Sequence, residues 1–168
     1  MRRILGIDPG SRVTGYGIID SDGVRSLHIA SGCIRLAQDD LPQRLGVIFQ
    51  EISHLLQAHR PAEVAIEQVF VSRNAGAALK LGQARGAAIC AAVTAGLPVS
   101  EYSPRSVKQA VVGAGGADKA QVQHMVKRLL RLSGELAADE ADALAVALSH
   151  AHTRTILNRL AGAGGGRR

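Results

Sequence analysis

The feature that most constrains the fold is a short apolar segment near the N-terminus that ends in an acidic residue. Residues 3–8 read Arg-Ile-Leu-Gly-Ile-Asp, and the turn residues Pro-Gly-Ser follow at 9–11. An apolar run bounded by turn residues predicts a buried strand. A carboxylate inside such a strand is costly to ionise unless it is paired or bound to a metal. We therefore expect Asp8 at the C-terminal end of the strand, where open α/β sheets place their sites. The alternative is that Asp8 only begins a turn, because Asp-Pro-Gly is good turn chemistry.

Two further strands are expected directly after the first. Residues 13–20 and a stretch within 24–36 alternate in the way that strands do, and 21–23 forms a hairpin-type loop between them. The three strands would then form an antiparallel meander. Gly15 and Gly17 either permit close backbone approach or mark a β-bulge, and we favour the bulge.

An amphipathic helix and a fourth strand follow the meander. Apolar residues recur at three- and four-residue intervals from Leu41 to Leu56, and Pro61 ends this helix. Phe49 lies on the apolar stripe and is expected in the core. The pattern of residues 63–67 then predicts a strand.

The fourth strand matters because of where it would end. A strand reached through a helix crossover usually runs parallel to its neighbour in the sheet. If residues 63–67 lie beside the first strand, Glu67 comes to the same edge of the sheet as Asp8.

An Ala- and Gly-rich helix is expected over residues 75–95, with a stripe of small side chains at Ala78, Gly82 and Gly86. Such a stripe lets another helix approach closely. The alternative is that these residues only fit the helix against its own sheet. We favour self-association through the stripe.

The remaining elements complete an α/β domain. Residues 99–102 predict a short last strand, and helices are expected from Pro104, from an N-cap at Asp118 to about residue 132, and from near 139 past 150. A length of 168 residues suggests one domain. We place this single domain at 1–158, with a five-stranded mixed sheet flanked by helices, and a disordered Gly/Arg tail at 159–168.

Composition narrows the class of partner and the compartment. The formal net charge is +6 and the sequence pI is about 10.0, which favours an anionic partner, with nucleic acid the leading candidate. No apolar stretch has membrane-spanning length, and the N-terminus lacks a signal-peptide core. Cys33 and Cys90 have no zinc-site spacing and are expected to be buried thiols in a reducing cytoplasm.

Two more acidic residues lie at the start of the last predicted helix. Asp139 and Asp142 are three apart and share a helix face, whereas Glu140 points elsewhere. Asp139 could serve only as an N-terminal cap. Asp142, on an otherwise apolar helix, needs a partner. Together with Asp8 and Glu67 these groups offer hard oxygen donors without paired His or Cys, which favours Mg²⁺ or Mn²⁺ over zinc. Two such ions about 3.5–4 Å apart support phosphodiester cleavage.

Four segments, taken in order, resemble the RuvC family of bacterial Holliday-junction resolvases. They are Ile-Asp-Pro-Gly at 7–10, Ile-Glu-Gln-Val-Phe at 66–70, Leu-Gly-Gln-Ala-Arg-Gly at 81–86 and Asp-Glu-Ala-Asp-Ala at 139–143. The resemblance implies a ribonuclease H-like fold and a homodimer that nicks two opposed strands of a four-way junction. It also implies two Mg²⁺ ions per subunit, with Mn²⁺ able to substitute, and partnership with the branch-migration proteins RuvA and RuvB. The residues carried over as the metal-binding catalytic tetrad are Asp8, Glu67, Asp139 and Asp142.

The resemblance also suggests roles for other residues. Lys108 and Lys119 match basic positions near the scissile phosphate, although a lone Lys is more often an ordinary solvated one. Phe70 is expected at the edge of the site, where it could stack on an unpaired junction base; the alternative is a core Phe. Arg73 and Lys80 are added as DNA-binding candidates.

Three other functions are weighed against junction cleavage. A junction-binding protein without cleavage would be expected to lack one of the four carboxylates. An actin-like kinase or ATPase needs a second phosphate motif and a second domain, for which the chain is too short. A related ribonuclease H-like nuclease that acts on structured RNA is the nearest alternative.

Overall fold

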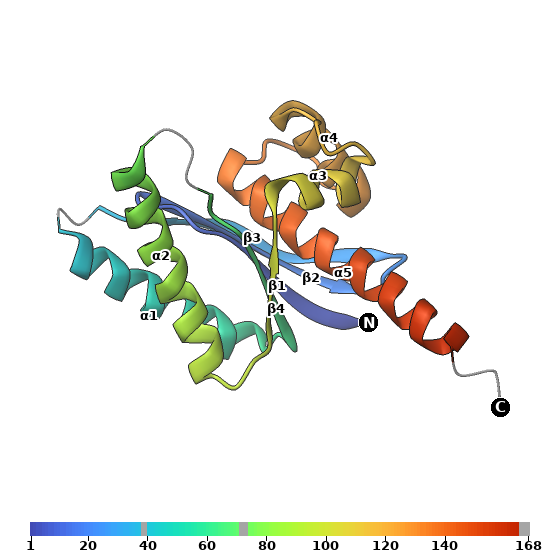
Figure 1. Cartoon of the computed structure of the whole chain (residues 1–168), viewed down its shortest axis with the longest axis horizontal. Coiled ribbons are helices and arrows are strands. Elements are labelled where there is room, and N and C mark those ends of the chain that lie inside the picture. The colour runs from blue at the N-terminus through green and yellow to red at the C-terminus, as the bar shows by residue number, and fades with distance from the viewer. Residues whose placement is uncertain (38–39, 71–73, 165–168) are drawn as a thin grey trace.

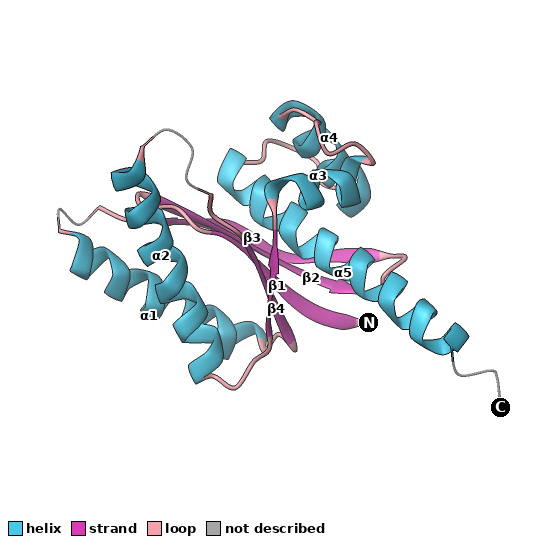
Figure 2. Cartoon of the chain, viewed as in Figure 1, coloured by secondary structure: helices cyan, strands magenta, loops and turns pink. Residues whose placement is uncertain are grey.

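A five-stranded mixed sheet lies at the centre of the molecule, with helices on both of its faces (Figures 1 and 2). The computed structural model describes residues 1–37, 40–70 and 74–164. The strands are β1 (Arg2–Asp8), β2 (Val13–Ser21), β3 (Ser26–Arg35), β4 (Glu63–Glu67) and β5 (Val99–Tyr102). Their order across the sheet is β3-β2-β1-β4-β5. β1, β2 and β3 form the predicted antiparallel meander, and β4 runs parallel to both β1 and β5.

The helices form two separate layers. α1 (Leu41–His59) and α2 (Ala75–Thr94) cover one face of the sheet, and α5 (Ala138–Gly164) crosses the other (Figure 1). α3 (Pro104–Val112) and α4 (Lys119–Leu130) pack chiefly on α5 rather than on the strands. Among the described residues, no helix is long and apolar enough to cross a membrane.

Local sequence explains where the helices begin and end. The side chain of Asp40 caps α1, and Asp118 forms a capping box with Gln121 at the start of α4. The side chain of Asn74 caps α2 as that of Asp40 caps α1. α1 ends before Pro61, as predicted, and Arg60 takes a left-handed conformation that turns the chain into β4.

Glycines let α5 lie directly against the backbone of β1 and β2. A Cβ atom on Gly6 would collide with the carbonyl oxygen of Ala143, and one on Gly15 would collide with that of Asp139. A Cβ atom on Gly17 would lie 2.7 Å from the Leu144 side chain. The bulge expected at Gly15 and Gly17 is therefore wrong, because both glycines serve close approach. The register of the β2–β3 pairing shifts after them, between Ile18 and Ile19, where the extra residue is Ile29 of β3.

Three further expectations differ from the structure. Phe49 is 36% exposed at the edge of α1 and is not a core residue. Cys33 is half-buried and Cys90 is exposed, so Cys90 is not the buried thiol that was expected. α5 continues to Gly164, past the domain boundary predicted at residue 158, and 165–168 lie outside the described residues.

Candidate active site

Two acidic residues end neighbouring parallel strands. β1 and β4 are paired in register from Ile4 opposite Glu63 to Ile7 opposite Ile66, so Asp8 and Glu67 are the next residues of the two strands. The two carboxyl groups lie close enough for each to influence the pKa of the other. The parallel pairing that would bring these two residues to one edge of the sheet is confirmed.

α5 adds a third carboxylate to this edge. Asp142 joins Asp8 and Glu67 in the wall of a cavity of about 210 Å³. The rest of the lining comes from α3, α4 and α5, and consists of Pro104, Val107, Lys108, Lys119, Val122 and Ala145. The cavity thus brings together the ends of two strands and three helices that are remote from them in the sequence.

Asp139 and Glu140 occupy different surroundings at the start of α5. Asp139 does not line the cavity, but its charge acts on both Asp8 and Asp142. Glu140 turns away, as predicted, and accepts hydrogen bonds from the Ser31 hydroxyl at 2.5 Å and from the Ala137 backbone N–H at 3.3 Å.

The carboxyl groups of the site repel one another and hold their protons tightly. Burial, reinforced by the charges of Glu67, Asp142 and Asp139, raises the pKa of Asp8 to about 8. Burial also raises the pKa of Glu67, and the charge of Asp142 adds to this effect. The pKa of Asp142 is raised by burial as well, although Lys119 opposes the rise. The cavity therefore holds too little positive charge for its acidic groups.

The two lysines supply part of the missing positive charge. Lys119, the first residue of α4, places its Nζ 3.5 Å from an oxygen of Asp142, and its side chain is 80% exposed. Lys108 of α3 lines the same cavity, and its charge lowers the pKa of Glu67 and Asp142 relative to the effect of burial alone. Such long, mobile side chains can turn toward a phosphate group that enters the cavity.

The donor set fits a hard divalent cation. Within residues 1–37, 40–70 and 74–164, no group of three or more His, Cys, Asp or Glu side chains is arranged so that it could hold a metal ion. The chemistry of the cavity nevertheless suits one, because the two lysines offset its acidic oxygens only in part and, among the described residues, no imidazole or thiol lines it.

Comparison with known proteins decides the family. The family model of the crossover junction endodeoxyribonuclease RuvC matches residues 4–150. The chain belongs to the RuvC family.

Relatives and solved structures in the RuvC family match nearly the whole chain. The crossover junction endodeoxyribonuclease RuvC of Alkalilimnicola ehrlichii is 58% identical over 98% of this chain and 99% of its own length. That of Methylococcus capsulatus is 60% identical over 95% of this chain and 96% of its own. A structure described as T. thermophilus RuvC in complex with Holliday junction substrate matches with a TM-score of 0.87 at 35% identity, covering 93% of this chain and 96% of that chain.

These matches confirm two predictions from the sequence. The ribonuclease H-like fold is confirmed, and so is the enzyme class, an endodeoxyribonuclease. Nucleases of the RuvC family use divalent metal ions, which agrees with the oxygen-rich donor set of the cavity.

The DNA-binding candidates outside the cavity lie in different places. Phe70 follows Glu67 by three residues and is 63% exposed, so the alternative of a core Phe does not hold. Lys80 is exposed on α2. Arg73 lies outside the described residues.

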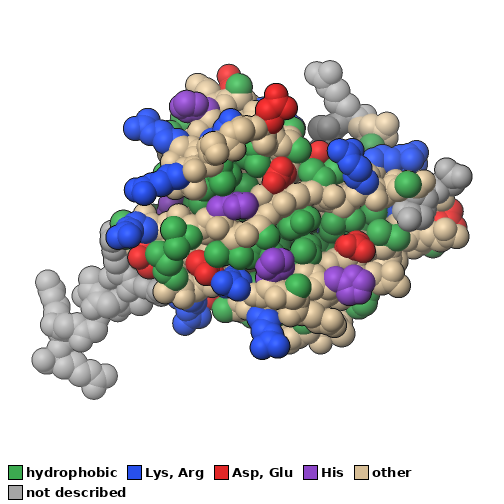
Figure 3. Space-filling view, turned by 180° about the vertical axis from the view of Figure 1, so that it is seen from behind, with side chains coloured by type: hydrophobic (Ala, Val, Ile, Leu, Met, Phe, Trp, Pro, Cys, Tyr) green, Lys and Arg blue, Asp and Glu red, His purple; other side chains and the backbone are tan. Residues whose placement is uncertain are grey.

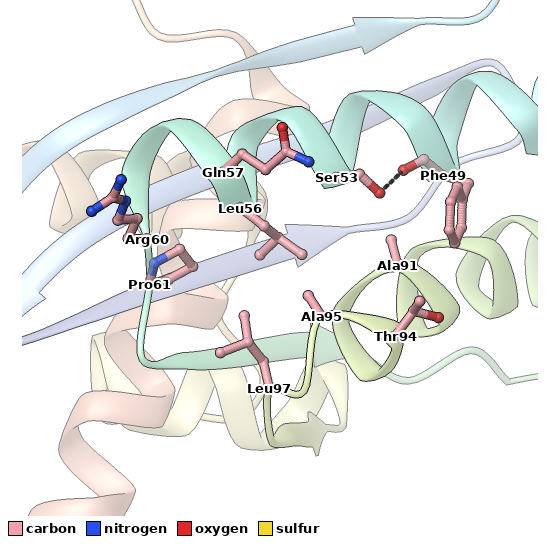
Figure 4. Close-up of a pocket in the computed structure, with 10 residues that line it drawn as sticks. All are labelled: Phe49, Ser53, Leu56, Gln57, Arg60, Pro61, Ala91, Thr94, Ala95 and Leu97. Carbon is pink, nitrogen blue, oxygen red and sulfur yellow. Dashed lines mark hydrogen bonds between the residues drawn. The ribbon is translucent and has the colours of Figure 1, made fainter.

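A second hollow, larger than the acidic cavity, lies elsewhere on the RuvC-family chain. A hollow of about 570 Å³ lies between the C-terminal halves of α1 and α2, and Phe49, Leu56 and Ala91 form part of its wall (Figure 4). The only hydrogen bond drawn there runs from the Ser53 hydroxyl to the Phe49 carbonyl oxygen, at 2.7 Å. The described residues that line this hollow are mostly apolar or uncharged, in contrast to the acidic cavity.

Sequence reasoning missed two polar groups, one beside the acidic cavity and one at the opposite end of β4. Arg85 of α2 donates a hydrogen bond to the Glu67 backbone. The sequence could have indicated this contact, because Arg85 lies between the buried helix positions Ala84 and Ala88. His150 is buried and lies 2.6 Å from Glu63 and 2.8 Å from the Tyr102 hydroxyl. No spacing in the sequence signals this second contact set, because its members come from three separate elements.

Proposed function

We propose that this chain is a structure-selective endonuclease that resolves four-way Holliday junctions in homologous recombination and DNA repair by paired symmetric nicks. The observation that carries the proposal is the acidic cavity at the ends of β1 and β4, in a chain of the RuvC family. Metal-assisted hydrolysis of a phosphodiester uses acidic side chains to hold the ions, and a basic group nearby can bind the phosphate. Asp8, Glu67 and Asp142 lie beside Lys108 and Lys119 in this cavity.

In this proposal the four acidic residues Asp8, Glu67, Asp139 and Asp142 hold two Mg²⁺ ions per subunit, and Mn²⁺ can substitute. When bound, such a pair of ions generates the nucleophilic hydroxide and stabilises the leaving oxygen. The raised pKa values of Asp8 and Glu67 support this assignment, because ligand carboxylates that repel one another gain most from a bound cation.

The basic and aromatic residues bind and orient the DNA. Lys108 and Lys119 offset the charge of the scissile phosphate as it enters the cavity. Phe70 stacks on an unpaired base at the crossover, and Arg73 and Lys80 contact DNA phosphates. Figure 3 shows further Lys and Arg side chains around the edge of the rear face, with hydrophobic side chains nearer its middle. Affinity would thus come mainly from phosphate contacts.

One experiment tests this function directly. Labelled four-way junction, matched linear duplex and structured RNA are each incubated with the protein, with and without Mg²⁺. We expect paired nicks in the junction only with Mg²⁺. Preferential cleavage of RNA would contradict the proposal and favour the ribonuclease alternative, and junction binding without any cleavage would reduce the protein to a binding module.

The proposed active form is a symmetric homodimer, because two nicks related by an approximate two-fold axis need two active sites. The outer face of α2 supports this contact. Gly82 has no atom within 4 Å of where a Cβ would lie, and Leu79 and Val93 are 70% and 59% exposed. Such apolar exposure on a helix with small residues suits a second copy of the same helix.

Substitution of the stripe tests the dimer. Gly82→Leu should leave each subunit folded but separate the two, so that single nicks outnumber paired ones. The matched control is Gly46→Leu on α1, since Gly46 is also an exposed helical glycine facing open space. Light scattering that shows a wild-type monomer making paired cuts at micromolar concentration would contradict the dimer.

The resemblance also supports action in the cytoplasm together with RuvA and RuvB, which supply branch migration. The basic net charge of +6 is compatible with a shared DNA substrate. Co-sedimentation of the three proteins on junction DNA, compared with DNA-free mixtures, measures whether the contact needs the substrate.

A further inference from the structure

Arg85 connects α2 to the end of the strand that carries Glu67. Its Nε donates a hydrogen bond of 3.1 Å to the Glu67 carbonyl oxygen. Its terminal nitrogen Nη2 lies 2.7 Å from the Glu101 carboxylate on β5. The arginine side chain is only 20% exposed, so its guanidinium group is largely shielded from water.

The two contacts of Arg85 are not equivalent. The Nε–H points at the Glu67 carbonyl in good hydrogen-bond geometry. Nη2 is buried and makes no aligned hydrogen bond, so its approach to Glu101 is an ion pair with an exposed partner, since the Glu101 side chain is 46% exposed. An ion pair with an exposed carboxylate contributes little to stability. The bond to the Glu67 backbone is therefore the contact with the more specific geometry.

The Glu67 carbonyl is the last backbone group of β4 before the chain leaves the sheet. Beyond it, the Gln68 N–H donates to the Tyr102 carbonyl at 2.8 Å. The peptide bond between Glu67 and Gln68 is thus held at both of its polar groups. Arg85 of α2 binds its carbonyl oxygen, and β5 binds its N–H. The direction of the Glu67 side chain depends on this peptide, because a rotation there would swing the carboxylate away from Asp8.

We propose that Arg85 is a positioning residue, which holds the end of β4 so that the Glu67 carboxylate faces Asp8 and Asp142. It acts through the backbone of Glu67 and touches neither DNA nor the reacting atoms. Groups that orient metal ligands in this indirect way commonly change metal affinity or activity 10–100-fold when removed. The inference rests on the catalytic role proposed above for Glu67.

The alternative is that Arg85 only stabilises the packing of α2 on the sheet and does not orient Glu67. Two variants separate the readings. Arg85→Met removes both contacts but keeps most of the aliphatic stem, whereas Glu101→Gln removes the ion pair and leaves the bond to Glu67 intact. A positioning role predicts that only Arg85→Met affects the site. A packing role alone predicts that both variants behave alike.

The experiment measures three quantities on the full chain of each variant. For Arg85→Met we expect single-turnover cleavage of saturating junction to fall roughly 10–100-fold. Calorimetry without DNA should show Mn²⁺ binding weakened on the order of tenfold. Junction affinity measured in a metal chelator should stay within about twofold of wild type, because phosphate contacts dominate it. Glu101→Gln should stay near wild type in all three, and Arg85→Lys should recover part of the loss.

Several outcomes would overturn the inference. Equal losses in Arg85→Met and Glu101→Gln would limit the arginine to this packing role, and so would a lower melting temperature with unchanged cleavage per folded molecule. If Arg85→Met does not fold, the comparison of Arg85→Lys with Glu101→Gln decides in the same way. Glu67→Gln is the reference: if it cleaves normally the proposed function fails, and if it is inactive while Arg85→Met is normal only the role of Arg85 fails.

Discussion

The two ends of β4 carry the same kind of residue in opposite electrostatic situations. Glu63, at the start of the strand, is 8% exposed and lies 2.6 Å from His150, 2.9 Å from Arg2 and 3.5 Å from Arg154. Burial acts to raise the pKa of Glu63, but the hydrogen bond with His150 and the neighbouring arginines outweigh it, and the pKa is lowered. The pKa of Glu67, at the other end, is raised by burial and by the charge of Asp142.

The difference separates a glutamate with a structural role from one that the proposed function makes a metal ligand. The neighbouring His150, Arg2 and Arg154 satisfy the Glu63 carboxylate without any ligand. Through these contacts Glu63 joins β4 to α5 and β1. Glu67 shares its surroundings with other acids, a state that costs stability unless a cation enters. The five residues of β4 thus run from a carboxylate whose charge is balanced to one whose charge is not.

The largest effect should come from substitution of Glu67, the carboxylate whose charge is not balanced. Glu67→Gln should lower junction cleavage by a factor on the order of 10³ while leaving junction binding intact, since removal of one charge-stabilising group commonly costs about 10²–10³. Asp8→Asn and Asp142→Asn should behave likewise. Cleavage assays and gel-shift titrations measure the two properties. Glu140→Gln is the control, and a loss there as large as in Glu67→Gln would contradict the assignment.

Substitution of Glu63, at the other end of β4, should lower the stability of the fold rather than the rate of cleavage. Glu63→Gln breaks a buried ion pair, which typically costs about 3 kcal/mol or more and lowers the melting temperature by roughly 6–12 °C in a domain of this size. Cleavage per folded molecule should be unchanged. Thermal unfolding and active-site-normalised rates measure the two. A stable but inactive variant would remove the distinction between the two ends of β4.

The same residue predicts a loss of stability in acid. The pKa of Glu63 is lower in the folded state than its ordinary value of 4.5. Its contribution is therefore present above pH 4.5 and is lost as the pH falls through the folded value. Wild-type protein should lose stability over this range, and Glu63→Gln should lose less.

Substitution of Phe70 tests whether the proposed site extends beyond Glu67 into the segment that follows β4. Phe70→Ala should weaken cleavage at the crossover by an amount corresponding to about 1–3 kcal/mol, the value of stacking on one base. Because its side chain is 63% exposed, the melting temperature should hardly change. A large drop in melting temperature with normal junction cleavage would assign Phe70 to packing within the protein.

The smallest effect concerns the metal-free protein. The pKa of Asp8 is raised from 3.8 to about 8, so the folded state binds its proton more tightly than the unfolded state does. Stability in a metal chelator should therefore fall as the pH rises from about 4 to 8. Asp8→Asn should lose most of this dependence and melt above wild type at pH 8. A wild-type melting curve that does not change with pH would contradict the repulsion inferred for the site.

Much of the fold and the acidic centre followed from the sequence because both depend on local patterns. The apolar run before Asp8 and the crossover helix before Glu67 were enough to expect two parallel strands ending together. The three-residue spacing of Asp139 and Asp142 placed them on one helix face. These expectations needed only the periods of strands and helices and the chirality of crossovers.

The rest depended on contacts between distant segments. Glu63 and His150 are 87 residues apart, and no periodicity shows that they meet. A glycine in a strand is compatible both with a bulge and with close packing beneath a helix. The local sequence around Gly15 and Gly17 therefore could not distinguish the two, and the bulge was the wrong choice. Phe49 fits an apolar stripe, yet it lies where the packing of α1 against α2 leaves a hollow.

The glycine contacts between α5 and the sheet have a consequence for motion. Because α5 rests on the backbone of β1 and β2 at Gly6 and Gly15, its first half cannot move outward without separating from the strands themselves. β1 and this part of α5 therefore belong to one cooperative unit, whose amide protons exchange with solvent only when the whole domain opens. α3 and α4, which pack chiefly on α5, can open locally at a lower free-energy cost. Local opening of these helices would move Lys108 and Lys119, while the acidic residues of β1 and α5 would keep their places relative to each other.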